Sequence, residues 1–273
     1  MSINNSYFSR NNTIISNSST NTGRNPVTEI FYGNTVDSLY PNGYSRFIFN
    51  LDLDLLKSKI YDGTISTGCT TTITHKLKMT NTTSFTLEYL NTSNSQSRQR
   101  ATSFDLILFR IPFINNNPNT PQLWDEGVGY DYINQFDEVF GDKNYSLRPS
   151  NWYQTTTIDK WQQPGMYSNT ESGDTPFSSL IIVDTQHFEL GNENISFDMT
   201  DEINGILDGS ITGVTGWGIA YLPAFETITG LTSNYSVSFF SRFTQTFYEP
   251  FLMTTYDDII LDDRNYKNKI VIK

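Results

Sequence analysis

The sequence predicts an all-β fold, a jelly-roll β-sandwich with one or two short helices and extended arms at its ends. Aromatic residues make up 14% of the 273 residues, whereas charged residues make up only 17%. Aromatic residues and Thr suit a half-buried pleated surface, and the frequent Asn and Ser suit turns. Short segments of alternating apolar and polar residues recur along the chain, and no helical pattern is long enough for a bundle. Since all-β domains often exceed about 200 residues, we expect one domain with tails.

The clearest strand pattern lies in residues 44–53, YSRFIFNLDL. Phe47, Phe49 and Leu51 alternate with Arg46 and Ile48, which predicts one face in a core and one largely polar face. The next segment, residues 54–60, has a cap residue and apolar residues at helical spacing, so we expect a short helix there.

Further strands are expected over residues 70–77, 83–89, 104–111, 178–183, 187–190, 195–199, 216–222, 236–243 and 250–256. A second short helix is expected over residues 201–207. These strands predict two antiparallel sheets packed face to face around one core. The residues expected in this core are Phe47, Phe49, Leu51, Phe104, Leu106, Leu108, Ile181, Trp217, Ile219, Phe239 and Leu252.

Both ends of the chain are expected to be arms outside a domain that spans residues 26–256. Residues 1–25 are rich in Asn, Ser and Thr without sustained periodicity, and residues 257–273 form a charged tail. Their few apolar residues do not offset about 1 to 2 kcal/mol per residue of backbone ordering, so we expect the arms to order against neighbouring subunits. The candidate assembly-interface residues are Tyr7, Phe8, Ile14 and Ile15 in the first arm, and Ile259, Ile260, Tyr266, Ile270 and Val271 in the tail.

A loop-rich excursion is expected from about residue 115 to residue 173, because long polar segments interrupt the strand pattern there. It carries the aromatic residues Trp124, Tyr130, Tyr132, Trp152, Tyr153, Trp161 and Tyr167. Exposed flat rings stack on sugars or fill protein interfaces, so Trp124, Trp152, Tyr153 and Trp161 are candidate glycan-binding or interface residues. The alternative is that these rings cap one end of the sandwich core.

The net charge and the cysteine content indicate which classes of partner and which cellular compartment to expect. The net charge of −11 disfavours direct binding to nucleic acid. A single cysteine, Cys69, allows no internal disulfide and no cysteine-based metal site within one chain. The N-terminus lacks the features of a signal peptide, and no apolar run approaches the roughly 20 residues of a membrane span. We therefore expect a protein made in a cytoplasm, without secretion by this route and without a membrane partner.

No recognisable catalytic set is encoded, so we expect no enzyme activity, no cofactor and no metal. The two histidines, His75 and His187, lie in separate strands without metal-binding or triad spacing. Adjacent carboxylates on one strand point to opposite faces, so pairs such as Asp125 with Glu126 do not form a hydrolytic pair. Asp201 and Glu202 suit the start of a helix. Two weaker alternatives stay open: a calcium site in the loop around Asp125 to Asp142, and a glycan-active enzyme with carboxylates from distant segments.

The C-terminal third resembles a jelly-roll module of the DNRLRE or disaggregatase-related type, which is carbohydrate-binding-like. The matching residues are Asp198, Thr200, Trp217, Gly218, Phe239, Ser241, Arg242, Glu249, Pro250, Leu252 and Tyr256, with an echo in Trp124-Asp125-Glu126. The resemblance covers roughly residues 30 to 257 and implies the same sandwich.

The leaderless, Asn- and Tyr-rich style also resembles structural proteins of tailed bacteriophages, including the crAss-like phages. This resemblance implies a virion protein, assembled in many copies into a neck or tail ring. Its partners would be copies of itself and portal, neck or tail subunits. The alternative is a carbohydrate-binding module, or a head-decorating or fibre protein that recognises host-surface glycans.

Overall fold

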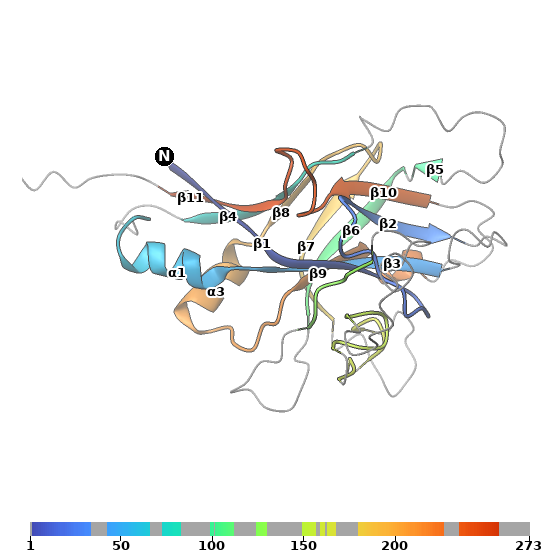
Figure 1. Ribbon diagram of the computed structural model, residues 1–273. Helices are drawn as coiled ribbons and strands as arrows, with labels where there is room; N and C mark the ends of the chain where they lie inside the picture. Colours follow the sequence, from blue (N-terminus) through green and yellow to red (C-terminus); the bar gives the residue numbers. More distant parts are fainter. Residues whose placement is uncertain are drawn as a thin grey trace, which may run out of the picture.

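The protein is an all-β sandwich in a computed structural model (Figure 1), as the sequence predicts. The structure describes residues 2–33, 43–65, 73–82, 99–100, 102–111, 124–129, 149–156, 159–161, 163–167, 180–226 and 235–256. The strands in these ranges are β1 (Ser2–Ile15), β2 (Val27–Gly33), β3 (Gly43–Leu51), β4 (Thr74–Met79), β5 (Gln99–Arg100), β6 (Phe104–Arg110), β7 (Ile181–Phe188), β8 (Ile195–Asp198), β9 (Trp217–Tyr221), β10 (Tyr235–Phe240) and β11 (Phe251–Tyr256). The helices are α1 (Leu53–Tyr61), α3 (Thr200–Asp208) and α4 (Pro223–Glu226).

Two sheets form the sandwich, and β1 belongs to both of them. Its first half pairs with β11, which continues through β4 to β8; we call this the β11 sheet. Its second half pairs with β3, which continues through β9 and β6 to β7; we call this the β9 sheet. The strands β10 and β2 extend the structure beside the start of β3.

The N-terminal segment differs from the arm that the sequence predicts. Residues 2–15 are a central strand, and Phe8, Ile14 and Ile15 are buried. A polar strand is stable here because its side chains find partners inside the protein. Asn12 Nδ2, for example, donates to the Ser150 carbonyl at 2.7 Å. The interface candidates of this segment are therefore core residues, except Tyr7, which is half exposed.

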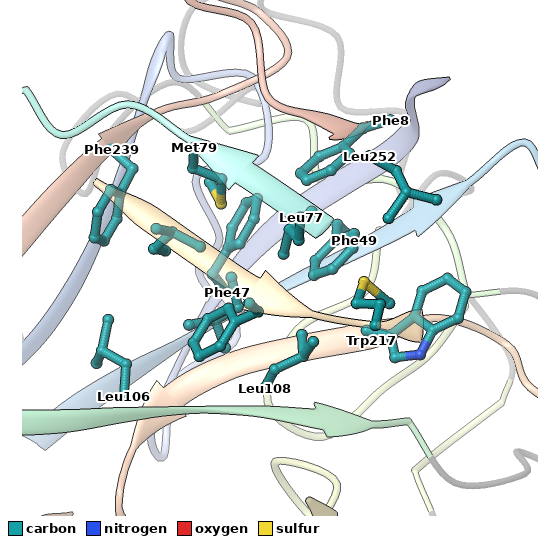
Figure 2. Close-up of a cluster of buried hydrophobic side chains, with 14 of the residues drawn as sticks. Phe8, Phe47, Phe49, Leu77, Met79, Leu106, Leu108, Trp217, Phe239 and Leu252 are labelled. Atoms are coloured by element: carbon teal, nitrogen blue, oxygen red, sulfur yellow. The ribbon is translucent and has the colours of Figure 1, made fainter. Parts of the chain in front are cut away.

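A core of aromatic and aliphatic side chains fills the space between the two sheets (Figure 2). Phe49 stacks on Phe8 with ring centroids 4.4 Å apart and lies 5.9 Å from Trp217. Ten of the eleven residues expected in this core are there. Ile181 is the exception: it is 46% exposed, because it lies at the start of the edge strand β7.

The two expected helices form at the same end of the sandwich (Figure 1). Asp52 begins α1 by accepting a hydrogen bond from the Leu55 backbone N–H. The helix α3 buries Ile203 against the core, and the short helix α4 was not expected. The predicted strand over residues 83–89 and the predicted tail over residues 257–273 lie outside the described residues.

Side chains, rather than a backbone ladder, join the facing edges of β7 and β8. The Gln186 amide donates to the Asn194 carbonyl at 2.9 Å and accepts from the Ser196 N–H at 2.7 Å. Asp184 accepts from the Asp198 N–H at 2.6 Å. These contacts nearly close the sandwich into a barrel, and just beyond them β8 ends and α3 begins.

Candidate binding surface

The two outer faces of the sandwich are unlike, and the difference decides which side chains can meet a partner. The outer face of the β9 sheet is covered by residues 124–129 and 149–167, which form a second core. Ile48, Ile107 and Phe109 point into this layer. Trp124, Trp152 and Trp161 lie in it with exposed fractions of 0%, 4% and 6%. Their rings pack on protein in this arrangement and leave no face for a sugar.

Other aromatic residues of the excursion are divided between the interior and the surface. Tyr167 is buried in the second core, whereas Tyr153 is 42% exposed. Tyr130 and Tyr132 lie outside the described residues. Of the candidate glycan or interface aromatics, Tyr153 alone is at the surface within the described part of the chain.

Arg46 fixes this covering layer to β3. It is fully buried and forms an ion pair with Glu226, at 2.7 Å from Nη2 to Oε2. Its guanidinium also donates to the carbonyls of Gly165 and Tyr167, and it lies 3.5 Å from the centroid of the Tyr167 ring. Burial alone would lower the pKa of Arg46, but the attraction of Glu226 outweighs it and raises this pKa.

A second set of contacts fixes residues 124–129 to β1 and to the segment after β10. Arg10 donates to the Trp124 carbonyl at 2.7 Å. Glu126 accepts from the Asn11 N–H at 3.0 Å and from Arg242 at 2.7 Å. The loop is thereby held in place, and Glu126 is used as a structural partner.

The outer face of the β11 sheet presents apolar side chains. Ile3, Asn5 and Tyr7 alternate outward along β1, with Ile3 61% and Tyr7 50% exposed. In the ladder Tyr7 faces Phe251 of β11, with ring centroids 6.2 Å apart, and Asn5 faces Met253. Phe251 and Met253 are partly exposed. Residues of β1 and β11 thus form an outward strip of four apolar side chains, Ile3, Tyr7, Phe251 and Met253.

The loop between β10 and β11 adds Phe247 and Tyr248, which lie four and three residues before Phe251. Phe247 is 88% exposed and lies 4.6 Å from Tyr248, which stacks on Phe240 at 5.2 Å. Ser241 fixes the start of the loop by bonds to the carbonyls of Pro26 and Asn25. We call Ile3, Tyr7, Phe240, Phe247, Tyr248, Phe251 and Met253 together the aromatic face.

Lysines lie beside the aromatic face: Lys76 of β4 faces Met253 in the ladder, and two others have hydrogen-bond partners. On β4, Lys78 faces Phe251 in the ladder, and its Nζ donates to Ser196 Oγ at 2.6 Å. Lys59 of α1 donates to Asn4 Oδ1 at 2.8 Å. The side chains of the face itself are mainly apolar, and they lie on ordered strands, so little backbone entropy is lost when a partner binds.

A groove of about 520 Å³ lies between the start of β7 and the N-terminus of α3. Ile181, Ile182 and Asp184 of β7 line it, together with Asp198, Asp201 and Ile211. At its base, Arg110 donates to both oxygens of Glu202, at 2.8 and 2.5 Å, and Trp217 Nε1 donates to Glu202 at 3.0 Å. The buried Glu202 is thus fully engaged, which its position in the sequence did not indicate.

The remaining titratable candidates have structural partners. His75 is buried with Nδ1 2.9 Å from Thr254 Oγ1, and burial lowers its pKa to about 4. His187 is exposed between Asp105 and Glu189, whose hydrogen bonds raise its pKa. A hydrogen bond from Thr200 lowers the pKa of Asp198. Within the described ranges no three His, Cys, Asp or Glu side chains are grouped to hold a metal ion.

The structure describes only part of the predicted carboxylate sites. Asp125 and Glu126 lie in the described loop, whereas the rest of the calcium candidate, residues 130–142, lies outside the described residues. Ile259, Ile260, Tyr266, Ile270 and Val271 of the tail also lie outside them. The helices of the described part include none long and apolar enough to cross a membrane.

No family model matches the chain, and no curated protein matches it either. The residues that carry the resemblance to the carbohydrate-binding-like module mostly build the fold: Trp217, Phe239 and Leu252 lie in the main core. The aromatic face was missed by sequence reasoning except at Tyr7. The alternation of Ile3, Asn5 and Tyr7 was an available signal, but the polar residues between them hid it.

Proposed function

We propose that this protein is a structural protein of a bacteriophage virion, present in many copies and held to its neighbours through the aromatic face. The neck or tail ring is the place that the sequence style suggests. The observation that supports assembly is the set of exposed and partly exposed apolar side chains that β1, β11 and the loop before β11 present. Aromatic residues and Met are enriched at protein interfaces, where exposed patches of this kind are commonly found.

Two properties of the face favour a protein partner over a glycan. A sugar site combines aromatic rings with several free hydrogen-bonding groups, because each hydroxyl needs a partner. Here the rings are accompanied by Ile3 and Met253, and the nearby Lys78 already donates to Ser196. Glycan recognition is the alternative. It would be favoured if the protein binds specific glycans on an array and if Phe247→Ser abolishes that binding.

The first prediction concerns Phe247. Truncating an aromatic anchor at an interface costs about 2 kcal/mol or more, roughly thirtyfold in Kd. Phe247→Ser should therefore weaken self-association by about that factor in sedimentation-velocity experiments over a concentration series. Because Phe247 is 88% exposed in one copy, the substitution should leave the unfolding free energy unchanged within about 0.5 kcal/mol.

Tyr61 supplies the matched control. It is an aromatic residue at the end of α1 and is 94% exposed, but it lies outside the aromatic face. Tyr61→Ser should associate like the wild type. Equal association of both variants, or a wild-type protein that stays monomeric at every concentration, would count against the proposal.

A further inference from the structure

The groove beside α3 is lined by both acidic and apolar side chains. Of its carboxylate and guanidinium groups, four are acidic (Asp184, Asp198, Asp201 and Glu202) and one is basic (Arg110), which leaves a net charge of −3. Ile181 and Ile182 of β7 also line it and are 46% and 45% exposed. A ligand that fits must therefore be cationic and apolar together.

The wall that carries Ile181 and Ile182 is the start of β7, which is an edge strand among the described residues. Within the described residues β7 forms a backbone ladder only with β6, and the register shifts by a bulge between Ile182 and Asp184. Further along, side chains of Asp184 and Gln186 hold β8 to this edge, but they do not reach Ile181. An extended peptide can add to such an edge, with backbone hydrogen bonds for affinity and side chains for specificity.

The chain itself contains a segment with the required chemistry. Residues 267–273 read KNKIVIK: three lysines flank an Ile-Val-Ile run of high β propensity. Three positive charges match the net charge of the groove, and the apolar run matches its isoleucines. The described chain ends at Tyr256, next to Thr255, which pairs with the groove residue Thr74. The ten residues between Tyr256 and Lys267 span at most about 33 to 36 Å, which is enough to reach an adjacent subunit.

We infer that the groove between β7 and α3 binds the C-terminal segment, residues 267–273, of a neighbouring copy. The inference rests on the proposed multi-copy assembly and adds a second contact to it. A neighbouring copy is taken as the source because the proposed assembly brings copies into contact, and Ile181 and Ile182 are 46% and 45% exposed for such a contact. Binding of this segment would also cover the edge of β7, and an uncovered strand edge tends to pair unspecifically with other chains.

A charge swap in the full-length protein tests this contact. Asp201→Lys and Lys269→Asp should each weaken self-association about tenfold in sedimentation velocity, because each places like charges together. The double variant should recover association to near the wild-type value. Asp54→Lys is the matched control, since Asp54 is likewise an exposed acid in the first turn of a helix, α1, outside the groove. It should associate like the wild type.

Cross-linking identifies the copy that supplies the segment. In a Cys69→Ser background, an Ile182→Cys protein mixed with a tagged Ile270→Cys protein should form a disulfide-linked heterodimer. A protein with both substitutions that forms only an intrachain disulfide would contradict the assignment to a neighbouring copy. If no disulfide forms and the charge swap does not restore association, the groove does not bind residues 267–273. If Phe247→Ser still reduces association in those cases, the proposed function survives while this inference fails.

Discussion

Arg46 illustrates what a strand pattern reveals about a single residue and what it leaves open. The alternation in residues 44–53 correctly places Arg46 on the face opposite Phe47 and Phe49. That face was expected to be largely polar, but residues far along the chain cover it, and Arg46 is fully buried. Ile48, on the same face, was the signal for a second apolar layer. A period of two identifies the face of a residue, while the solvation of that face depends on distant segments.

The buried ion pair gives a prediction at the scale of residues. Arg46→Met leaves Glu226 as an unpaired buried carboxylate, so the free energy of unfolding should fall by about 3 to 5 kcal/mol. Adding Glu226→Met should recover part of this loss, because no unpaired charge then remains. Guanidinium titrations of the two single variants and the double variant measure the coupling. A loss below about 1 kcal/mol for Arg46→Met would mean that the pair is solvated.

At the scale of elements, β1 shows why an Asn-rich segment escapes sequence reasoning. Its polar side chains bond to protein groups instead of water: Asn11 donates to the Gly23 carbonyl at 2.8 Å, and Thr13 and Thr28 share a hydrogen bond of 2.9 Å. Hydropathy does not distinguish a polar side chain with an internal partner from a solvated one. The strand β2 was also missed, although its sequence, VTEIFYG, is rich in β-branched and aromatic residues.

Elements with strong apolar alternation were predicted well. The strands β3, β6, β9 and β11 form where the pattern places them, as do α1 and α3, each within a few residues. The predicted strands over 178–183 and 187–190 are one continuous strand, β7, since the polar residues between them lie on an exposed edge. The aromatic face could not be predicted, because it depends on which strands become neighbours and which outer face is left uncovered.

The place of β1 in the fold gives a prediction at this scale. Ile14→Ala should lower the free energy of unfolding by about 2 to 5 kcal/mol, because Ile14 is fully buried in the second core. Ile3→Ala, on the same strand but 61% exposed, should change it by less than about 0.5 kcal/mol. Chemical denaturation of the isolated protein measures both. If both substitutions change the free energy of unfolding equally and negligibly, residues 2–15 are a detached arm and not a strand of the fold.

At the scale of the whole molecule, the sandwich has one outer face built into the fold and one that presents apolar groups. The covered face uses the tryptophans that the sequence offered as binding residues, so their function is to pack the second core. The aromatic face combines β1, β11 and the loop between β10 and β11, three segments from both ends of the described chain. Contact between copies through this face is the central claim of the proposed function.

Side-chain footprinting with hydroxyl radicals tests that claim most directly, because it reports the solvent access of individual residues as the protein associates. Oxidation of Phe247, Tyr7 and Met253 should fall as concentration raises the associated fraction, while Tyr61, 94% exposed on α1, should react equally throughout. Protection of the aromatic face alone is the result that the proposal predicts. Unchanged oxidation of Phe247 and Tyr7 in a protein that has associated would contradict it.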